Sequence, residues 1–291
     1  MPASDHFLSL RVMNLTMKNL FAYSLFLLLL ASCATQESNQ EPVPEPVQVV
    51  LSTSLGEITL ELSNKTPQHR DNFLNLVKEG AYDSLLFHRV IEGFVIQGGD
   101  PESKHAGASD TLGSGGREYK VPAEFDTALF HKRGALGAAR TGNPDRASSS
   151  MQFYIVQAST PIVDSVFTIA EGRINGWLKS HYHINASENK DWYDSLKIVL
   201  DLEDWERYGQ LNDTLKALAE NFTDFDEYTI PDSHREFYKK VGGTPHLDQN
   251  YTVFGQVIEG MEVVDAIAAQ SVSDLDRPLI DVRILSARIR E

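Results

Sequence analysis

The chain has 291 residues, of which 42% are hydrophobic and 23% are charged, a composition that is ordinary for a globular protein with a full core. Its formal net charge of −15 argues against nucleic acid as the main partner, because binding to phosphates needs basic patches and none is visible. The single cysteine, Cys33, excludes an intramolecular disulfide and a zinc site built from cysteines.

An apolar run over residues 21–31 follows a basic residue, Lys18, and ends just before Cys33. The run is short for a bilayer span, and it has the basic flank, apolar stretch and small-residue end of a secretory signal. Residues 30–33, Leu-Ala-Ser-Cys, resemble the lipoprotein box of bacteria, in which the cysteine is acylated, for example with palmitate, and becomes the mature N-terminus. An ordinary signal peptide with an incidental cysteine, or an uncleaved anchor helix, is the alternative.

We therefore predict a signal peptide with a lipoprotein box over residues 1–33 and a lipid anchor on Cys33. The expected location is the cell envelope of a bacterium, facing the periplasm or the exterior, and Met17 is an alternative start of the signal. Several acyl chains on one cysteine would anchor the protein stably in a membrane. A flexible tether over residues 34–46, polar, acidic and stiffened by prolines, would join the anchor to a globular domain over residues 47–291.

The first elements expected in this domain are two strands and a helix. Residues 47–51 and 57–62 have the composition of strands, and the short turn between them suits a hairpin. Thr66 and Pro67 then supply an N-cap residue and a proline at the first helical position. Apolar residues at helical spacing follow, which predicts a helix that ends at Gly80.

Further short strands dominate the remainder of the domain. A second hairpin signal, Glu92-Gly93, divides two apolar runs, and a glycine-rich polar loop over residues 98–117 comes after them. The strands that we expect are at residues 85–91, 94–97, 134–139, 152–157, 252–258 and 279–289, with a short helix at 260–269. Many short strands with two helices predict a closed barrel that is capped at its ends.

The segment over residues 166–242 differs from the rest of the domain in its composition and in its pattern of apolar residues. It contains all three tryptophans of the chain, many charges and no strand alternation. Leu196, Val199 and Leu200 lie at helical spacing, which favours two to four helices packed on or beside the barrel. We interpret the segment as an α-helical insertion that interrupts the domain, and we expect its aromatic residues to form its own packing surface.

Three sequence blocks carry the strongest functional signal. The first block, FHRVIEGFVIQGGD at residues 87–100, resembles the signature of the cyclophilins. The second block, SMQFYI at residues 150–155, resembles the second active-site strand of that family, and the third, LDQNYTVFG at residues 247–255, resembles its third segment. The blocks lie in family order, and the resemblance covers residues 47–164 and 243–291. It implies a mainly β fold: a closed eight-stranded antiparallel barrel capped by two helices, with the α-helical segment inserted.

The resemblance also implies peptidyl-prolyl cis/trans isomerase activity on proline-containing polypeptides, with no cofactor and no metal. Arg89 would be the catalytic residue, donating a hydrogen bond to the prolyl amide. The substrate-binding positions that the resemblance implies are Phe94, Val95, Gln97, Ala139, Arg140, Gln152, Tyr154, His246, Leu247 and Tyr251.

Three of these positions depart from the family pattern. His246 stands where many eukaryotic members carry a tryptophan that helps to bind cyclosporin, so we expect weak sensitivity to that drug. Arg140 stands where they carry an asparagine, and Tyr154 stands where phenylalanine is usual. The ring of Tyr154 still offers a flat apolar face, although its hydroxyl requires a hydrogen-bond partner.

The residues themselves fit this chemistry. Rotation about an X-Pro amide faces a barrier of about 18–20 kcal/mol and needs no nucleophile, metal or proton transfer to cross it. A catalyst must hold the proline ring in an apolar pocket and offer a donor that favours the twisted amide. Strand alternation places Arg89 and Ile91 on one face, and Gln152 and Tyr154 share a face of a later strand. In isolation, Arg89 would more often be a solvated strand residue than a catalyst.

The predicted function is therefore prolyl isomerisation that accelerates the folding of exported proteins at the cell envelope. Two alternatives stand beside it. The domain could bind proline-bearing segments as a chaperone of low turnover, or it could be an assembly module whose insertion docks on an envelope protein partner. The sequence predicts attachment to the membrane through the lipid anchor.

Overall fold

The computed structural model describes residues 45–290 of the chain. The predicted signal peptide, the predicted lipidation site at Cys33 and most of the predicted tether lie outside the described residues. Within residues 45–290, none of the helices combines the length and the apolar character that crossing a bilayer requires.

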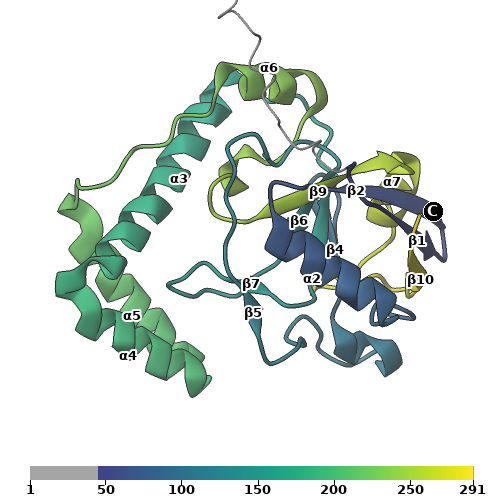
Figure 1. The fold of residues 1–291 in the computed structure, drawn as a ribbon, viewed down its shortest axis with the longest axis horizontal. Helices are drawn as coiled ribbons and strands as arrows, with labels where there is room; N and C mark the ends of the chain where they lie inside the picture. The colour runs from purple at the N-terminus through teal and green to yellow at the C-terminus, as the bar shows by residue number, and fades with distance from the viewer. Residues whose placement is uncertain (1–44, 291) are drawn as a thin grey trace, which may run out of the picture. The chain divides into compact units, whose positions relative to one another are not determined.

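An eight-stranded sheet organises the fold (Figure 1). Its strands follow the order β10-β1-β2-β9-β6-β8-β4-β3, and every adjacent pair is antiparallel. The strands are β1 (Gln48–Thr53), β2 (Gly56–Leu62), β3 (Phe87–Ile91), β4 (Val95–Gly98), β6 (Ala135–Ala138), β8 (Phe153–Val156), β9 (Val253–Glu259) and β10 (Ile284–Ile289). A second sheet has two strands, β5 (Lys120–Val121) and β7 (Ser148–Ser149).

The prediction of a closed barrel is wrong, because the eight strands form an open half-barrel. β3 and β10 stand at the two ends of the strand order, and no continuous ladder joins them. A single bridge links Leu86 to Arg283, just outside both strands. The chain that faces the free edge of β3 is an irregular segment before Ile284, which meets it through isolated backbone hydrogen bonds such as Phe87 N–H to Val282 O at 2.9 Å. The sheet therefore stays open along this edge.

Two helices pack against the apolar face of the sheet. They are α2 (Pro67–Lys78) and α7 (Met261–Ala268), and their buried residues join those of the strands in one core. Pro67 occupies the start of α2 as predicted, but Thr66 makes no side-chain capping bond. The ring of Phe73 from α2 lies 5.7 Å from the ring of Phe153 in β8, in an edge-on arrangement. The core side of the domain is thus filled by strand and helix residues together.

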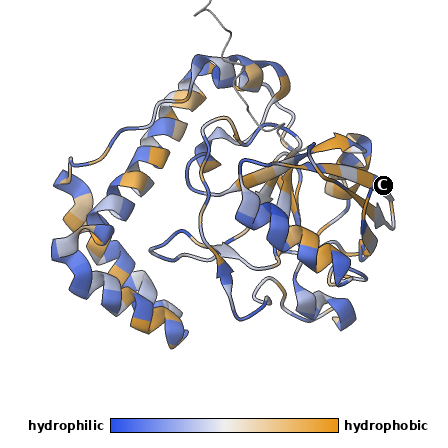
Figure 2. Cartoon of the chain, in the orientation of Figure 1, coloured by the Kyte–Doolittle hydropathy of each residue, from blue (hydrophilic) through white to orange (hydrophobic). Residues whose placement is uncertain are grey.

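A helical segment stands beside the sheet (Figure 1). The long helix α3 runs from α6 at one end to α4 and α5 at the other. In Figure 2, α4 and α5 alternate between hydrophobic and hydrophilic residues along their length, which is typical of helices with one apolar face. The helices are α3 (Asp164–Asn185), α4 (Lys190–Asp201), α5 (Trp205–Leu218) and α6 (Asp232–Val241), and the short 3₁₀ turns of the domain are η1 (Pro101–His105), η2 (Ser187–Asn189), η3 (Ala219–Asn221) and η4 (Pro245–Leu247).

Candidate active site

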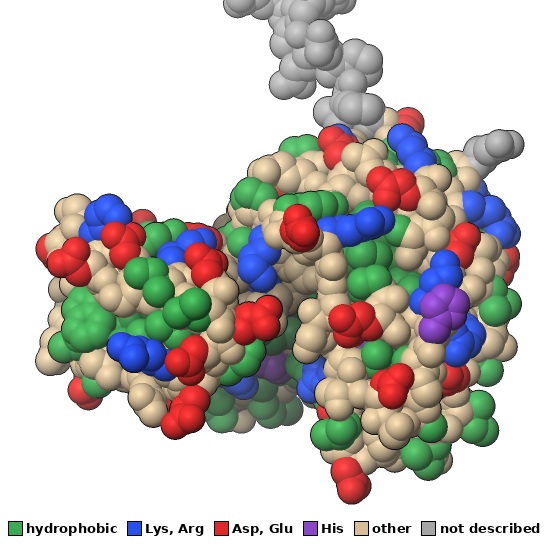
Figure 3. Space-filling view, turned by 90° about the horizontal axis from the view of Figure 1, so that it is seen from below, with side chains coloured by type: hydrophobic (Ala, Val, Ile, Leu, Met, Phe, Trp, Pro, Cys, Tyr) green, Lys and Arg blue, Asp and Glu red, His purple; other side chains and the backbone are tan. Residues whose placement is uncertain are grey.

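A cavity of ≈ 290 Å³ lies between the sheet and the helical segment. Its walls come from β3, β4, β8, η4 and α3, and from the chain that follows β6. The space-filling view from below shows the surface hollowed between these two parts of the domain (Figure 3). The lining residues are Arg89, Phe94, Val95, Gln97, Ala139, Arg140, Tyr154, Arg173, Trp177, His246, Leu247 and Tyr251. We call this space the prolyl cavity, after the substrate that the sequence resemblance implies, and every predicted substrate-binding residue except Gln152 lines it.

The β3–β4 hairpin brings Arg89 to the wall of the prolyl cavity. The register pairs Arg89 with Gln97 of β4. The side chain of Arg89 is 40% exposed, and its Nε lies 3.4 Å from Oδ2 of Asp276, which is 39% exposed. An ion pair with this exposure contributes little to stability. The described residues thus leave most of the guanidinium N–H groups available to a ligand in the cavity.

Gln97 and Gln152 are hydrogen-bonded to one another, but only Gln97 reaches the prolyl cavity. Nε2 of Gln97 donates to Oε1 of Gln152 at 3.1 Å. Nε2 of Gln152 donates in turn to the backbone carbonyls of Gly113 and Gly115, at 3.0 and 2.8 Å. The structure therefore places Gln152 behind the lining, where it orients the amide of Gln97.

The hydroxyl of Tyr154 finds its partner in a buried histidine. It lies 2.8 Å from Nε2 of His131, and Nδ1 of His131 lies 2.8 Å from Oδ1 of Asp248. The other carboxylate oxygen of Asp248 accepts a hydrogen bond from the hydroxyl of Tyr238 in α6 at 2.8 Å. Burial raises the pKa of Tyr154 well above its ordinary value, so the hydroxyl stays protonated and can donate to His131. We call these four residues the buried relay.

The ring of Tyr154 lies directly over the backbone of β6. A Cβ atom at Gly137 would stand 2.3 Å from the ring carbon that bears the hydroxyl, a distance that no side chain tolerates. Glycine at this position is thus what lets the ring lie flat in the floor of the prolyl cavity. Because the hydroxyl is held by His131, the ring is fixed at both its face and its tip.

Arg140 closes one rim of the prolyl cavity. Its Nε donates to the carbonyl of Asn250 at 3.1 Å, and one terminal nitrogen donates to Oδ1 of the same residue at 2.6 Å. The guanidinium carbon lies 4.7 Å from the centre of the Tyr251 ring, within range of a cation–π interaction. Burial lowers the pKa of Arg140, although an arginine remains charged at neutral pH.

The helix α3 contributes two residues to the cavity that sequence reasoning missed. Trp177 packs with the apolar residues of the cavity wall, so the expectation that the aromatic residues of the insertion form a separate surface is wrong for this one. Arg173, one turn earlier on α3, lies with its guanidinium carbon 5.0 Å from the Trp177 ring. The spacing of an arginine and a tryptophan four residues apart was the only signal in the sequence, and it does not say what the pair faces.

The charge of the prolyl cavity is positive. Three arginines line it and no carboxylate does. The ring of His246 stacks on Phe94 with centres 5.8 Å apart, and burial, helped by the nearby Arg173, lowers the pKa of His246 to about 4. Its imidazole is therefore neutral at pH 7. Within residues 45–290, no group of three or more His, Cys, Asp or Glu side chains is placed to hold a metal ion.

Comparisons with known proteins agree on one family. The family described as "Cyclophilin type peptidyl-prolyl cis-trans isomerase/CLD" matches residues 48–199 and 228–289, more than half of the chain. Proteins of Staphylococcus aureus and Staphylococcus epidermidis, whose names provisionally assign them as peptidyl-prolyl cis-trans isomerases, are each 30% identical over 254 residues, covering 87% of this chain and 96% of theirs. A crystal structure of a cyclophilin type isomerase of Cryptosporidium parvum has a TM-score of 0.50 at 19% identity, covering 84% of this chain and 98% of its own, which speaks for the fold alone.

Proposed function

Because the chain belongs to the family of cyclophilin type peptidyl-prolyl cis-trans isomerases, we propose that it isomerises X-Pro bonds in the prolyl cavity, with Arg89 as the catalytic residue. The proline ring would sit among the apolar side chains, and Gln97 would hold the backbone of the polypeptide. The observation that supports this most directly is the position of Arg89, a permanent cation on the wall of a cavity that apolar side chains also line, with one weak ion pair among the described residues.

The chemistry that we propose for Arg89 follows from the nature of the amide. In the planar amide the nitrogen lone pair is shared with the carbonyl, and this sharing is the source of the rotational barrier. In the twisted amide the lone pair is localised on nitrogen and can accept a hydrogen bond. A guanidinium N–H that bonds the nitrogen mainly in the twisted state binds the transition state more tightly than the substrate, which lowers the barrier. Arginine suits this role because it stays charged and presents a rigid set of donors.

Replacing Arg89 with alanine is expected to lower kcat/KM for a proline-containing peptide by about tenfold or more, which corresponds to at least roughly 1.4 kcal/mol. The exchange of the peptide between its cis and trans forms, followed with and without enzyme, measures the effect. Arg288→Ala is the matched control, because Arg288 also forms an exposed ion pair, with Glu57, but does not line the cavity. Equal rates for wild type and the Arg89 variant would reject the mechanism, whereas a variant that still protects client proteins but no longer isomerises the peptide would support the binding module of low turnover.

We further propose that the clients are exported polypeptides and that the protein is held at the envelope of a bacterium by lipid on Cys33. The support is the sequence of residues 21–33, an apolar run that ends in Leu-Ala-Ser-Cys. The prolyl cavity lies in the domain that begins near residue 47, so an anchored chain would present it to folding proteins at the membrane surface.

Cys33→Ala tests the anchor. Cells that express the wild-type chain and are fed labelled palmitate should incorporate label into it and retain it in the membrane fraction, whereas the variant should take up no label. Ser32→Ala, which keeps a small residue beside an intact Cys33, is the control and should behave as wild type. Label on the Cys33 variant, or none on the wild-type chain, would contradict the proposed anchor.

A further inference from the structure

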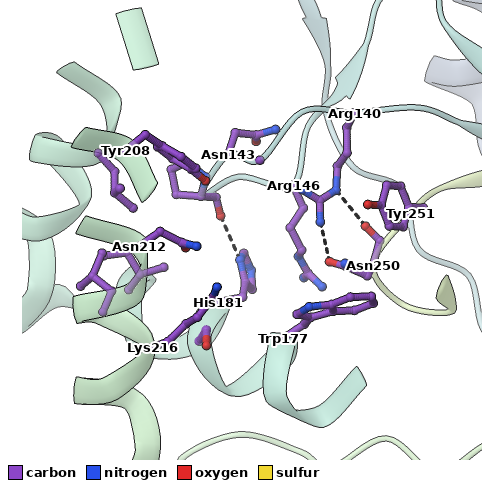
Figure 4. A pocket seen from close by; sticks show the side chains of 16 residues that line it. Arg140, Asn143, Arg146, Trp177, His181, Tyr208, Asn212, Lys216, Asn250 and Tyr251 are labelled. Carbon is purple, nitrogen blue, oxygen red and sulfur yellow. Dashed lines mark hydrogen bonds between the residues drawn. The ribbon is translucent and has the colours of Figure 1, made fainter. Parts of the chain in front are cut away.

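A second cavity adjoins the prolyl cavity (Figure 4). It has a volume of ≈ 250 Å³ and lies between the loop that follows β6 and the helices α3, α4 and α5. Its lining shares Arg140, Trp177 and Tyr251 with the prolyl cavity. In Figure 4, Arg140 and Arg146 reach into it from the sheet side, and His181 and Lys216 face them from the helices. We call this space the arginine cavity.

The two arginines of this cavity have no acidic partner in the part of the chain that the structure describes. All the hydrogen bonds of Arg140 go to neutral acceptors, namely the two oxygens of Asn250 and the carbonyl of Thr141. Arg146 donates from one terminal nitrogen to the carbonyl of Gln249 at 2.8 Å, and no described residue accepts a hydrogen bond from its buried Nε. Among residues 45–290, no carboxylate forms an ion pair with either of them, although the whole chain carries a net charge of −15.

The nearest acidic residue in the sequence is turned to other partners. Asp145, beside Arg146, does not line the arginine cavity. One of its carboxylate oxygens accepts from the hydroxyl of Tyr193 at 2.6 Å, and the other lies 3.1 Å from Nζ of Lys197. Both partners belong to α4. The arginines are therefore left without compensation even where a carboxylate stands next to one of them in the chain.

The remaining ionisable groups leave the arginine cavity positive at neutral pH. Burial, together with repulsion from Arg140, lowers the pKa of Arg146 to about 10, so Arg146 stays charged. Burial and the positive charge of Arg146 lower the pKa of His181 to about 4, so its imidazole is neutral. Lys216 adds a third cation, and its ion pair with Asp213 at 3.2 Å lies on an exposed surface. Two half-buried cations that repel one another are costly unless an anion joins them.

We propose that the arginine cavity is a second substrate subsite, which binds a carboxylate of the same polypeptide whose proline occupies the prolyl cavity. This proposal rests on the isomerase function proposed above. A carboxylate presents two oxygens that match the fork of N–H donors of an arginine, and it would give Nε of Arg146 the acceptor that it lacks. Because the cavities share three lining residues, an extended segment can reach both within a few residues of the proline.

The consequence is a substrate preference that the helical segment creates. The side of the arginine cavity opposite the sheet is built by α3, α4 and α5. A client with aspartate or glutamate near its proline would gain charge-assisted hydrogen bonds, and one with lysine there would meet three cations. The carboxylate can be that of a side chain or that of the end of a client chain, and the two sources are separable by experiment.

A position scan with peptides tests the subsite on the full chain. Peptides with one proline and an amidated C-terminus carry either Glu or Gln at each of the four positions before and after the proline, and kcat/KM is measured for each at low salt. We expect Glu at one or two neighbouring positions to raise kcat/KM about fivefold to tenfold over Gln, and salt to reduce the gain. A second set, which ends in a free C-terminus at each of the four positions after the proline, shows whether a chain end binds as an acidic side chain does.

The Arg146→Gln variant shows whether the arginine cavity is the place where the carboxylate binds. It should abolish most of the gain from Glu and leave kcat/KM for the Gln peptides unchanged, because Arg146 does not line the prolyl cavity. Arg146→Lys, which keeps the charge but loses the fork, should retain part of the gain. Lys190→Gln is the matched control, because it removes one cation of the helical segment from an exposed pair with Asp194, and it should keep the full gain.

The outcomes separate the two proposals. If wild type isomerises the Gln peptides but shows no preference for a carboxylate at any position, the subsite is wrong and the isomerase function stands. A preference that survives in Arg146→Gln, or that disappears equally in Lys190→Gln, would also overturn the subsite, since the effect would then come from the overall charge. If no peptide is isomerised by wild type, the proposed function itself fails.

Discussion

Replacing Asp248 with alanine is expected to lower the free energy of unfolding by about 3–5 kcal/mol. The side chain of Asp248 is 1% exposed, and it accepts hydrogen bonds from the backbone N–H and Nδ1 of His131 and from the hydroxyl of Tyr238. Its removal leaves these donors buried without an acceptor, and each unpaired group carries its full cost of desolvation. Urea denaturation followed by circular dichroism measures the change.

Two controls isolate the buried relay. Asp194→Ala removes a carboxylate from an exposed pair with Lys190 and should change the free energy of unfolding by less than about 1 kcal/mol. Asp248→Asn keeps the shape of the side chain and one acceptor oxygen. Its loss in the free energy of unfolding should therefore lie between that of Asp194→Ala and that of Asp248→Ala. A loss of under 1 kcal/mol for Asp248→Ala would show that the relay contributes little to stability.

The second large effect is expected in the core, where Phe153→Ala should also cost about 3–5 kcal/mol. The ring is 1% exposed and meets three other rings, with centres 5.7 Å away for Phe73, 5.6 Å for Tyr82 and 6.2 Å for Phe87. Alanine would leave a cavity among rings that α2, the turn after it and β3 hold in place. The midpoint of urea denaturation, with the slope checked for constancy, gives the loss.

Two further substitutions set the scale for Phe153. Phe153→Leu keeps most of the apolar volume and should cost much less than alanine, about 1.5 kcal/mol or less. Leu275→Ala removes an apolar side chain that is 73% exposed, and it should change stability by no more than about 0.5 kcal/mol. A loss at Phe153→Ala no greater than that at Leu275→Ala would contradict the placement of this ring in a packed core.

The sequence predicted best those features that depend on neighbours along the chain. The strand and turn signals around Glu92-Gly93 place Arg89 opposite Gln97, because a hairpin fixes its own register. The start of α2 was predictable for a similar reason, since Pro67 favours the first turn of a helix wherever it stands. Alternation in β8 likewise separates Phe153, which faces the core, from Tyr154, which faces the cavity.

Features that join distant parts of the chain were not predictable from local patterns. The open edge between β3 and β10 depends on the path of the irregular segment before Ile284. The prediction of a closed barrel rested on the number of strands alone, which does not show whether the two outer strands pair with each other. The partner of the Tyr154 hydroxyl is His131, whose own partner Asp248 is 117 residues away from it in the sequence. Helical spacing in the insertion predicted helices, but it does not say which face of α3 meets the sheet, so Trp177 was missed.

The bond between Tyr238 and Asp248 makes the helical segment part of the domain's own hydrogen bonding. Excision of residues 166–242 would remove the Tyr238 hydroxyl, which donates a hydrogen bond to one oxygen of the Asp248 carboxylate. It would also remove Trp177 from the wall of the prolyl cavity. The shortened chain would therefore differ from the native one in its cavity as well as in its length. The helical segment is therefore a structural part of the cavity and of the hydrogen bonding beneath it.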